Sequence, residues 1–213
     1  MKEIVNPVQI DYLAFLRNEK DELTLEMEKF AKEHKVPILN WNAAQLLLFL
    51  IQSKRPKRVL EIGTAIGYSS ILAAKVLRKK SVLHTIEKSR DNIKLAGEYI
   101  KRAQLADKIK IIEGDALKIM PELKKKYDFI FLDADKQDYE KLFEHSIPLL
   151  KRNGILFIDN LLWHGCVAYK RIPAKEKKST DIIRNFNRLF MESKLLKSAI
   201  FPIGDGVGIG IKL

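Results

Sequence analysis

From residue 58 onward, short apolar runs alternate with helical patterns, and this alternation restricts the fold more than any other feature. The runs are rich in Val, Ile, Leu and Phe and cover residues 58–63, 82–87, 109–113, 127–133 and 154–159. Helical patterns fill the intervals, over residues 68–79, 91–104, 116–123 and 138–149. Because the runs are apolar on both faces, we expect an α/β fold in which a parallel sheet carries helices on each side.

The first fifty residues differ from this core. Apolar residues at helical spacing predict an amphipathic helix that ends at Val36-Pro37. Segment 43–51 is apolar all round, which predicts a fully buried helix. No linker or repeat marks a boundary, so we predict a single domain over residues 1–213. Its N-terminal helices, in residues 1–55, help to roof the acceptor pocket of a Rossmann-like core over residues 56–213.

The C-terminal part predicts one more helix and two more strands. Ser179-Thr180-Asp181 is expected to open the helix. Two apolar runs, 199–203 and 207–213, then flank Gly204-Asp205-Gly206, and Asp-Gly between apolar runs is typical of a hairpin. We therefore predict a mostly parallel sheet with one antiparallel strand.

Length and cysteine content bear on the location of the chain. The longest strongly apolar stretch, residues 43–51, is far shorter than the ~20 residues that cross a bilayer, so we expect no transmembrane helix and no membrane partner bound in that way. The first residues have no apolar segment typical of a secretory signal. A single cysteine, Cys166, forms no intrachain disulfide, and we expect a cytoplasmic protein.

The turn after the first predicted strand indicates a nucleoside site. It reads Glu61-Ile62-Gly63-Thr64-Ala65-Ile66-Gly67-Tyr68-Ser69, and Glu87 ends the next strand 20 residues after Gly67, where an acid accepts ribose hydroxyls. Ala65 replaces the glycine that clears room for a pyrophosphate, which disfavours an NAD-dependent oxidoreductase. Glu61 would repel phosphate and suit a cationic amino-acid group. These conditions favour S-adenosylmethionine as the ligand. The alternative is that the segment is a tight turn whose acids bind no ligand.

Oxygen-bearing side chains follow the next predicted strands. Asp115 would reach an adenine edge or cap the next helix, and both roles are compatible. Asp133 ends the fourth strand, and Asp159 with Asn160 ends the fifth, so neighbouring parallel strands would bring three oxygen donors together. Such donors suit Mg²⁺ or Ca²⁺, although each Asp alone would more often cap a turn. Lys136, next to that charge, would be able to take up a proton.

The segment after Asn160 and the charge balance concern the acceptor. Trp163 would form the substrate wall or pack in the core, and His164 and Cys166 are too few for a zinc site.

The chain has 39 Lys and Arg against 27 Asp and Glu, a net charge of +12, which favours nucleic acid first and a membrane surface second. Basic residues cluster at 54–58, 78–80, 124–126 and 170–178. We expect the first three clusters to be solvated surface opposite the site, and residues 170–178 to be a candidate polyanion contact.

Four segments resemble the cation-dependent, catechol-type O-methyltransferases. They are VLEIGTAIGYSS (59–70), FLDADKQDY (131–139), FIDNLLWHG (157–165) and FPIGDGVGI (201–209). The resemblance covers nearly the whole chain. It implies a class I methyltransferase fold with a seven-stranded sheet, a homodimer, and an enzyme that transfers a methyl group from S-adenosylmethionine to a hydroxyl oxygen.

The resemblance also implies roles for individual residues. Those for the cofactor are Glu61, Gly63, Ser69 near the carboxylate, Glu87 at the ribose, Asp115 and Ala116 at adenine, and Asp133 beside them. Asp133, Asp159 and Asn160 would bind a divalent cation, for which we expect Mg²⁺, and Lys136 would act as the base, so that Asp133 and Lys136 form the catalytic pair. A non-catalytic, nucleic-acid-binding relative is disfavoured because this set is intact.

Two acceptors remain open. Residues 27–39 and 56–70 resemble the bacterial tRNA 5-hydroxyuridine methyltransferases, which produce 5-methoxyuridine at the wobble position. Trp163-His164 instead resembles the loop of members that methylate catechols and caffeoyl esters. The basic segment 170–178 favours tRNA as the partner, with a small hydroxylated aromatic molecule as the alternative.

Overall fold

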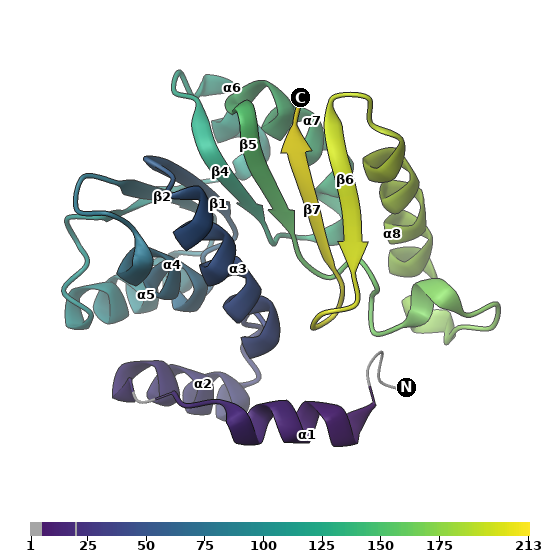
Figure 1. The fold of residues 1–213 in the computed structure, drawn as a ribbon, viewed down its shortest axis with the longest axis horizontal. Coiled ribbons are helices and arrows are strands. Elements are labelled where there is room, and N and C mark those ends of the chain that lie inside the picture. The colour runs from purple at the N-terminus through teal and green to yellow at the C-terminus, as the bar shows by residue number, and fades with distance from the viewer. Residues whose placement is uncertain (1–5, 20) are drawn as a thin grey trace.

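A seven-stranded sheet forms the centre of the protein, in the strand order β3-β2-β1-β4-β5-β7-β6. The computed structural model describes residues 6–19 and 21–213. The strands are β1 (Arg58–Ile62), β2 (Val82–Glu87), β3 (Ile109–Glu113), β4 (Tyr127–Leu132), β5 (Leu150–Ile158), β6 (Leu196–Phe201) and β7 (Val207–Lys212). β7 lies antiparallel between β5 and β6, and the pairs among β1 to β5 are parallel (Figure 1). The predicted mostly parallel sheet with one antiparallel strand is confirmed.

Helices cover both faces of this sheet. They are α1 (Pro7–Leu16), α2 (Glu22–His34), α3 (Trp41–Lys54), α4 (Tyr68–Val76), α5 (Arg90–Arg102), α6 (Ala116–Glu122), α7 (Tyr139–Leu149) and α8 (Ala174–Glu192), with short 3₁₀ turns at Lys136–Asp138 and Cys166–Ala168. α2 to α5 pack on one face and α6 to α8 on the other. Along β4, Phe129 and Phe131 enter the first core, whereas Ile130 and Leu132 enter the second. This two-sided burial explains the continuous apolar runs.

Expectations about four elements were wrong in detail. β6 covers Leu196–Phe201 rather than residues 199–203. α3 is buried along one face only, and Phe49 is 66% exposed. β5 begins at Leu150 rather than at residue 154, because an irregularity in its pairing with β4 accommodates the polar residues 151–153. α8 begins at Ala174 rather than near Ser179, because Pro173 precedes a run of good helix formers, residues 174–178.

Of the N-terminal helices, α2 and α3 contribute residues to the first core, whereas α1 buries none of its residues. Arg17, which follows α1, donates two hydrogen bonds to Glu28 of α2, and Glu28 also accepts one from the Tyr68 hydroxyl at the start of α4. This network ties the N-terminal segment to the turn after β1. Within residues 6–19 and 21–213, no helix combines the length and the hydropathy needed to span a membrane.

Candidate active site

A cleft of about 640 Å³ opens where β1, β2, β4 and β5 end. Ile62 pairs with Leu132, and Leu132 pairs with Ile158, so the residues that follow these strands meet at one edge of the sheet. Of the residues singled out from the sequence, the lining includes Gly63, Glu87, Asp115, Ala116, Asp133, Lys136, Asp159, Asn160, Trp163 and His164. Pro37 and Ile38, between α2 and α3, also line the cleft. The sheet topology thus places most of the predicted site together.

Gly63 sets the close approach of two loops at this edge. Its φ is +96°, and a Cβ atom there would lie 1.9 Å from the carbonyl oxygen of Asp133. Any other residue would therefore push the turn after β1 away from the end of β4. The requirement for glycine comes first from this backbone contact, and the same contact brings both loops to the cleft.

Glu61 and Ser69 are not among the residues that line the cleft. Glu61 is 1% exposed, and it accepts hydrogen bonds from the hydroxyls of Ser69 (2.5 Å) and Ser70 at the start of α4. The carboxylate thus fixes the turn between β1 and α4 from inside the fold. Direct contact of Glu61 and Ser69 with a cofactor stays a prediction.

The burial of Glu61 predicts a pH-dependent stability. Burial raises the pKa of Glu61 from 4.5 to about 7, despite the serine hydrogen bonds that lower it. Because the folded state retains this proton, the free energy of unfolding should fall as pH rises from about 4.5 to about 7, by on the order of 3 kcal/mol. In Glu61→Gln, urea unfolding should show a correspondingly shallower fall between pH 5 and pH 8. Parallel curves for the two proteins would contradict this assignment.

Glu87 holds the loops after β1 and β2 at the cleft. Its Oε2 accepts from the backbone amides of Thr64 (3.2 Å) and Ala65 (3.0 Å), and its Oε1 accepts from those of Lys88 (3.0 Å) and Ser89 (2.9 Å). These four bonds fix the carboxylate at the wall where the sequence places a ribose contact.

Asp115 caps α6 and lies at the wall of the cleft, and its contact with an adenine edge stays a prediction. Its Oδ1 accepts from the amide of Leu117 (2.9 Å), which caps α6, and the residue also lines the cleft beside Ala116. A capping carboxylate at the cleft wall is compatible with a contact to an adenine edge.

Asp133, Asp159 and Asn160 form a set of oxygen donors at the other side of the cleft. Asp159 is 4% exposed, and its Oδ1 has no hydrogen-bond partner within the described chain. Burial, with the nearby charge of Asp133, raises the pKa of Asp159 to about 8. No three His, Cys, Asp or Glu side chains gather at metal-binding spacing in the described ranges, and the third donor here is the amide of Asn160. The orphaned carboxylate oxygen and this hard donor set fit a divalent cation.

Lys136 reaches the same oxygen atoms. Its Nζ donates to Asn160 Oδ1 (2.5 Å), Tyr139 Oη (2.9 Å) and the carbonyl of Ala134 (3.1 Å), and it lies 3.4 Å from Asp133 Oδ1. The ammonium group thus supplies the positive charge that the carboxylates require. The residue is positioned to exchange a proton with a hydroxyl bound beside these donors.

Tyr139 and Asp205 also contact the residues of the site, and neither is a candidate from the sequence pattern. The Tyr139 hydroxyl donates to the carbonyl of Asp159 (3.1 Å) and accepts from Lys136, so it orients the lysine. Asp205, in the turn between β6 and β7, accepts from the amide of His164 (2.5 Å) and, at 3.5 Å, from the side-chain nitrogen of Asn160. This contact turns the amide oxygen of Asn160 toward Lys136. In the sequence, the position of Tyr139 three residues after Lys136 is the feature that points to Tyr139. The position of Asp205 between two glycines is the feature that points to Asp205.

With the methyl transfer and the cation-binding role of Asn160 that the sequence resemblance implies, Asp205→Asn is expected to lower the rate roughly 10- to 100-fold, the usual cost of losing a group that orients a metal ligand. The new amide cannot accept from both Asn160 and His164, so the Asn160 oxygen loses its fixed direction. The variant should need a higher cation concentration to reach half of its maximal rate. Its affinity for S-adenosylmethionine, measured by calorimetry, should be unchanged. The control is Asp181→Asn, an exposed acid paired with Arg184 on α8. An equal effect in both variants would refute the positioning role of Asp205.

The loop after β5 forms the remaining wall. Asn160, Trp163 and His164 have positive φ angles of 62°, 44° and 53°. Such conformations are sparsely populated by non-glycine residues and need support from the surrounding structure. Trp163 supplies part of that support, because its Nε1 donates to Glu176 Oε2 of α8 (3.0 Å) while its ring packs on the second core. The two sequence interpretations of Trp163, wall and core, both describe its position.

Comparison with known proteins identifies the family to which the chain belongs. A family model described as O-methyltransferase matches residues 16–213. The caffeoyl-CoA O-methyltransferase of Populus kitakamiensis is 32% identical over 171 residues, which cover 76% of this chain and 73% of that protein. A Staphylococcus aureus structure provisionally named a caffeoyl-CoA O-methyltransferase has a TM-score of 0.90 and 31% identity, over 97% of this chain and 100% of the other.

A Bacillus cereus O-methyltransferase solved in complex with SAH has a TM-score of 0.83 and 25% identity, over 95% of this chain and 96% of the other. The sequence resemblance and the fold are therefore matched by homologues along most of their length. The chain belongs to the O-methyltransferase family that includes the caffeoyl-CoA O-methyltransferases, and it is a methyltransferase.

Proposed function

We propose that this methyltransferase uses S-adenosylmethionine and a divalent cation to methylate a hydroxyl group that lies next to a second oxygen atom of the acceptor. The observation that carries the proposal is the single cleft that joins Glu87 and Asp115 on one side to Asp133, Lys136 and Asp159 on the other. The first group suits a nucleoside, and the second suits a metal-bound pair of oxygens. The SAH complex of the Bacillus cereus homologue supports the choice of cofactor.

Each residue of the cleft would have a specific role in such a reaction. Glu87 would accept hydroxyls of the ribose, and Asp115 would meet the adenine. Asp133, Asp159 and Asn160 would hold the cation, whose charge supplies stabilisation of the acceptor oxygen once its proton has left. Lys136 Nζ would take that proton, and Tyr139 would keep the lysine directed at it. Pro37, Ile38 and Trp163 would exclude water and align the acceptor with the methyl group, because alignment supplies much of the acceleration.

Two acceptors share the required chemistry. A catechol has two adjacent ring oxygens, and 5-hydroxyuridine has its hydroxyl next to the ring carbonyl. The named relatives support a small catechol-like or caffeoyl-type acceptor. The basic segment 170–178 supports tRNA, because it leads into α8 at the mouth of the cleft: Ser179 lines the cleft, and Lys178 donates to Gln137, which also lines it. The charge argument makes tRNA our first candidate.

Replacing Lys175, Lys177 and Lys178 with Ala separates the two acceptors. Each phosphate contact contributes roughly 0.7 to 0.9 to the slope of log K against log salt, so the triple variant should weaken tRNA binding and flatten this slope by up to about two units. Turnover of a small catechol, which has no phosphate, should stay near the wild-type rate. The matched control removes Lys29, Lys32 and Lys94, three exposed lysines of α2 and α5. A loss of catechol turnover with an unchanged salt slope would instead assign the segment to a small-molecule lid.

A further inference from the structure

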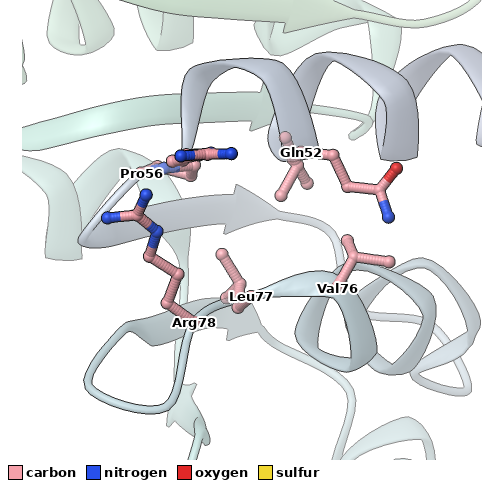
Figure 2. A pocket seen from close by; sticks show the side chains of 7 residues that line it. Gln52, Pro56, Val76, Leu77 and Arg78 are labelled. Atoms are coloured by element: carbon pink, nitrogen blue, oxygen red, sulfur yellow. The ribbon is translucent and has the colours of Figure 1, made fainter.

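A second cleft, of about 530 Å³, lies at the edge of the sheet opposite the active site. Its lining comes from the ends of α3 and α4 and from the residues that follow them: Ile51, Gln52, Arg55, Pro56, Val76, Leu77 and Arg78. Figure 2 shows Gln52 on the α3 wall, Val76 and Leu77 on the α4 wall, and the Arg78 side chain extended toward Pro56. The cleft thus combines an apolar floor with two guanidinium groups.

Neither guanidinium group makes a polar contact in the described chain that would stabilise the fold. Within residues 6–19 and 21–213, Arg55 and Arg78 form no hydrogen bond or ion pair through their side chains, and both residues are exposed. In contrast, Arg17 binds Glu28, and Arg102 binds Glu26. Two unpaired cations at one concave surface favour an anionic ligand.

The surrounding edge of the sheet is strongly basic. Several lysines there have a structural role, because Lys108 donates to the carbonyls of Ala74 and Leu77 at the end of α4, and Lys126 and Lys212 donate to carbonyls at the end of α7. Other exposed cations at this edge have no such partner in the described chain: Lys57, Lys79, Lys80, Lys110, Lys124, Lys125 and Arg152. The nearby acids are Asp107, Glu122 and Asp128, and Asp128 is paired with Lys151.

The positive field of this edge reaches a titratable group inside it. His84 on β2 is half-buried, and burial lowers its pKa; the charges of Lys125, Lys110 and Arg58 lower it further. The cations therefore act together on the start of the sheet.

We propose that this face binds the phosphate backbone of a nucleic acid, with one nucleotide seated in the cleft between Arg55 and Arg78. Several unpaired cations at one edge of the sheet match the phosphates of a nucleic acid, guanidinium planes stack on bases, and the amide of Gln52 provides both a donor and an acceptor for a base edge. A membrane surface fits less well, because none of the large exposed apolar side chains lines this cleft. The proposal holds for either acceptor, since the face lies away from the active site.

The test uses the full chain, a fluorescein-labelled RNA stem-loop, and fluorescence anisotropy at a series of KCl concentrations. Arg55→Gln/Arg78→Gln should weaken binding and flatten the slope of log K against log salt by about 1.4 to 1.8 units, the effect of two phosphate contacts. Gln keeps the first three carbons of the arginine side chain and a polar end without the charge, and Arg55 already has a φ of 52°, so the exchange adds no backbone strain. The control Lys29→Gln/Lys32→Gln removes equal charge from α2 and should leave the slope near that of the wild type.

A second variant, Lys79→Gln/Lys80→Gln in the exposed turn after α4, should flatten the slope in the same way even if the first variant is unstable. Both variants should retain the unfolding midpoint and catechol turnover of the wild type, which separates this face from the active site. An RNA affinity and slope unchanged in both variants, or no RNA binding by the wild type, would overturn the proposal. Binding to phosphatidylserine vesicles that depends on Arg55 and Arg78, without RNA binding, would overturn it in favour of a membrane.

Discussion

Asp159→Ala is expected to reduce methyl transfer by roughly 10³-fold or more, because a bound cation supplies several kcal/mol of charge stabilisation and each 1.36 kcal/mol is about tenfold in rate. Asp159 is the most deeply buried of the three oxygen donors, and its Oδ1 has no other partner in the described chain. The variant should behave like the wild type treated with EDTA. Asp133→Ala should do the same, with some loss of cofactor affinity because Asp133 also borders Gly63.

Because Oδ1 of Asp159 has no hydrogen-bond partner in the described chain, a loss of activity in Asp159→Ala can be distinguished from a loss of folding. Removing a buried carboxylate that accepts no hydrogen bond at Oδ1 leaves few groups unsatisfied. Asp159→Ala should therefore unfold at or above the wild-type temperature in EDTA, and its S-adenosylmethionine affinity should be retained. Methyl transfer within tenfold of wild type would rule out Asp159 as a cation ligand.

Lys136→Met is expected to reduce the maximal rate by roughly 10²- to 10⁴-fold, the usual contribution of a positioned general base. Met retains much of the length of the side chain but has no group that takes a proton. The pH–rate profile should also lose its rising limb, which a merely structural role would not affect. Lys141→Met, on an exposed face of α7, is the matched control.

The cation dependence distinguishes Lys136 from Asp159. Lys136 Nζ lies 2.5 Å from Asn160 Oδ1 and 3.4 Å from Asp133 Oδ1, so removal of the ammonium frees donors for the cation. Half-saturation by Mg²⁺ should therefore occur at an equal or lower concentration in Lys136→Met. In Asp159→Ala, excess Mg²⁺ should not restore the rate. A wild-type pH profile in Lys136→Met would show that another group accepts the proton.

Much of the site was predictable because parallel strands bring their carboxyl ends to one edge. Runs that are apolar on both faces indicate where the strands lie. Acids directly after those runs therefore lie together at the edge where the strands end, as Asp133 and Asp159 do. The position of Glu61 was not predictable in the same way. A residue on the strand itself points into one of the two cores, and the α4 serines close over it.

The parts that sequence did not predict depend on long-range packing. Asp205 meets Asn160 only because β7 enters the sheet between β5 and β6, and the hairpin pattern gave no information about that neighbour. Most of the basic residues near Arg55 and Arg78 are exposed, as a solvated surface requires, but a sequence does not show that the ends of α3 and α4 form a cleft between them.

The most direct test of the proposed function measures transfer of a labelled methyl group from S-adenosylmethionine to a catechol and to an RNA hairpin that contains 5-hydroxyuridine, with Mg²⁺ and with EDTA. We expect transfer to at least one acceptor in Mg²⁺, loss of transfer in EDTA, and recovery when Mg²⁺ is returned in excess. S-adenosylmethionine should raise the unfolding midpoint under both conditions, because Glu87 and Asp115 lie on the other side of the cleft from the cation ligands. Transfer that continues undiminished in EDTA would contradict the account.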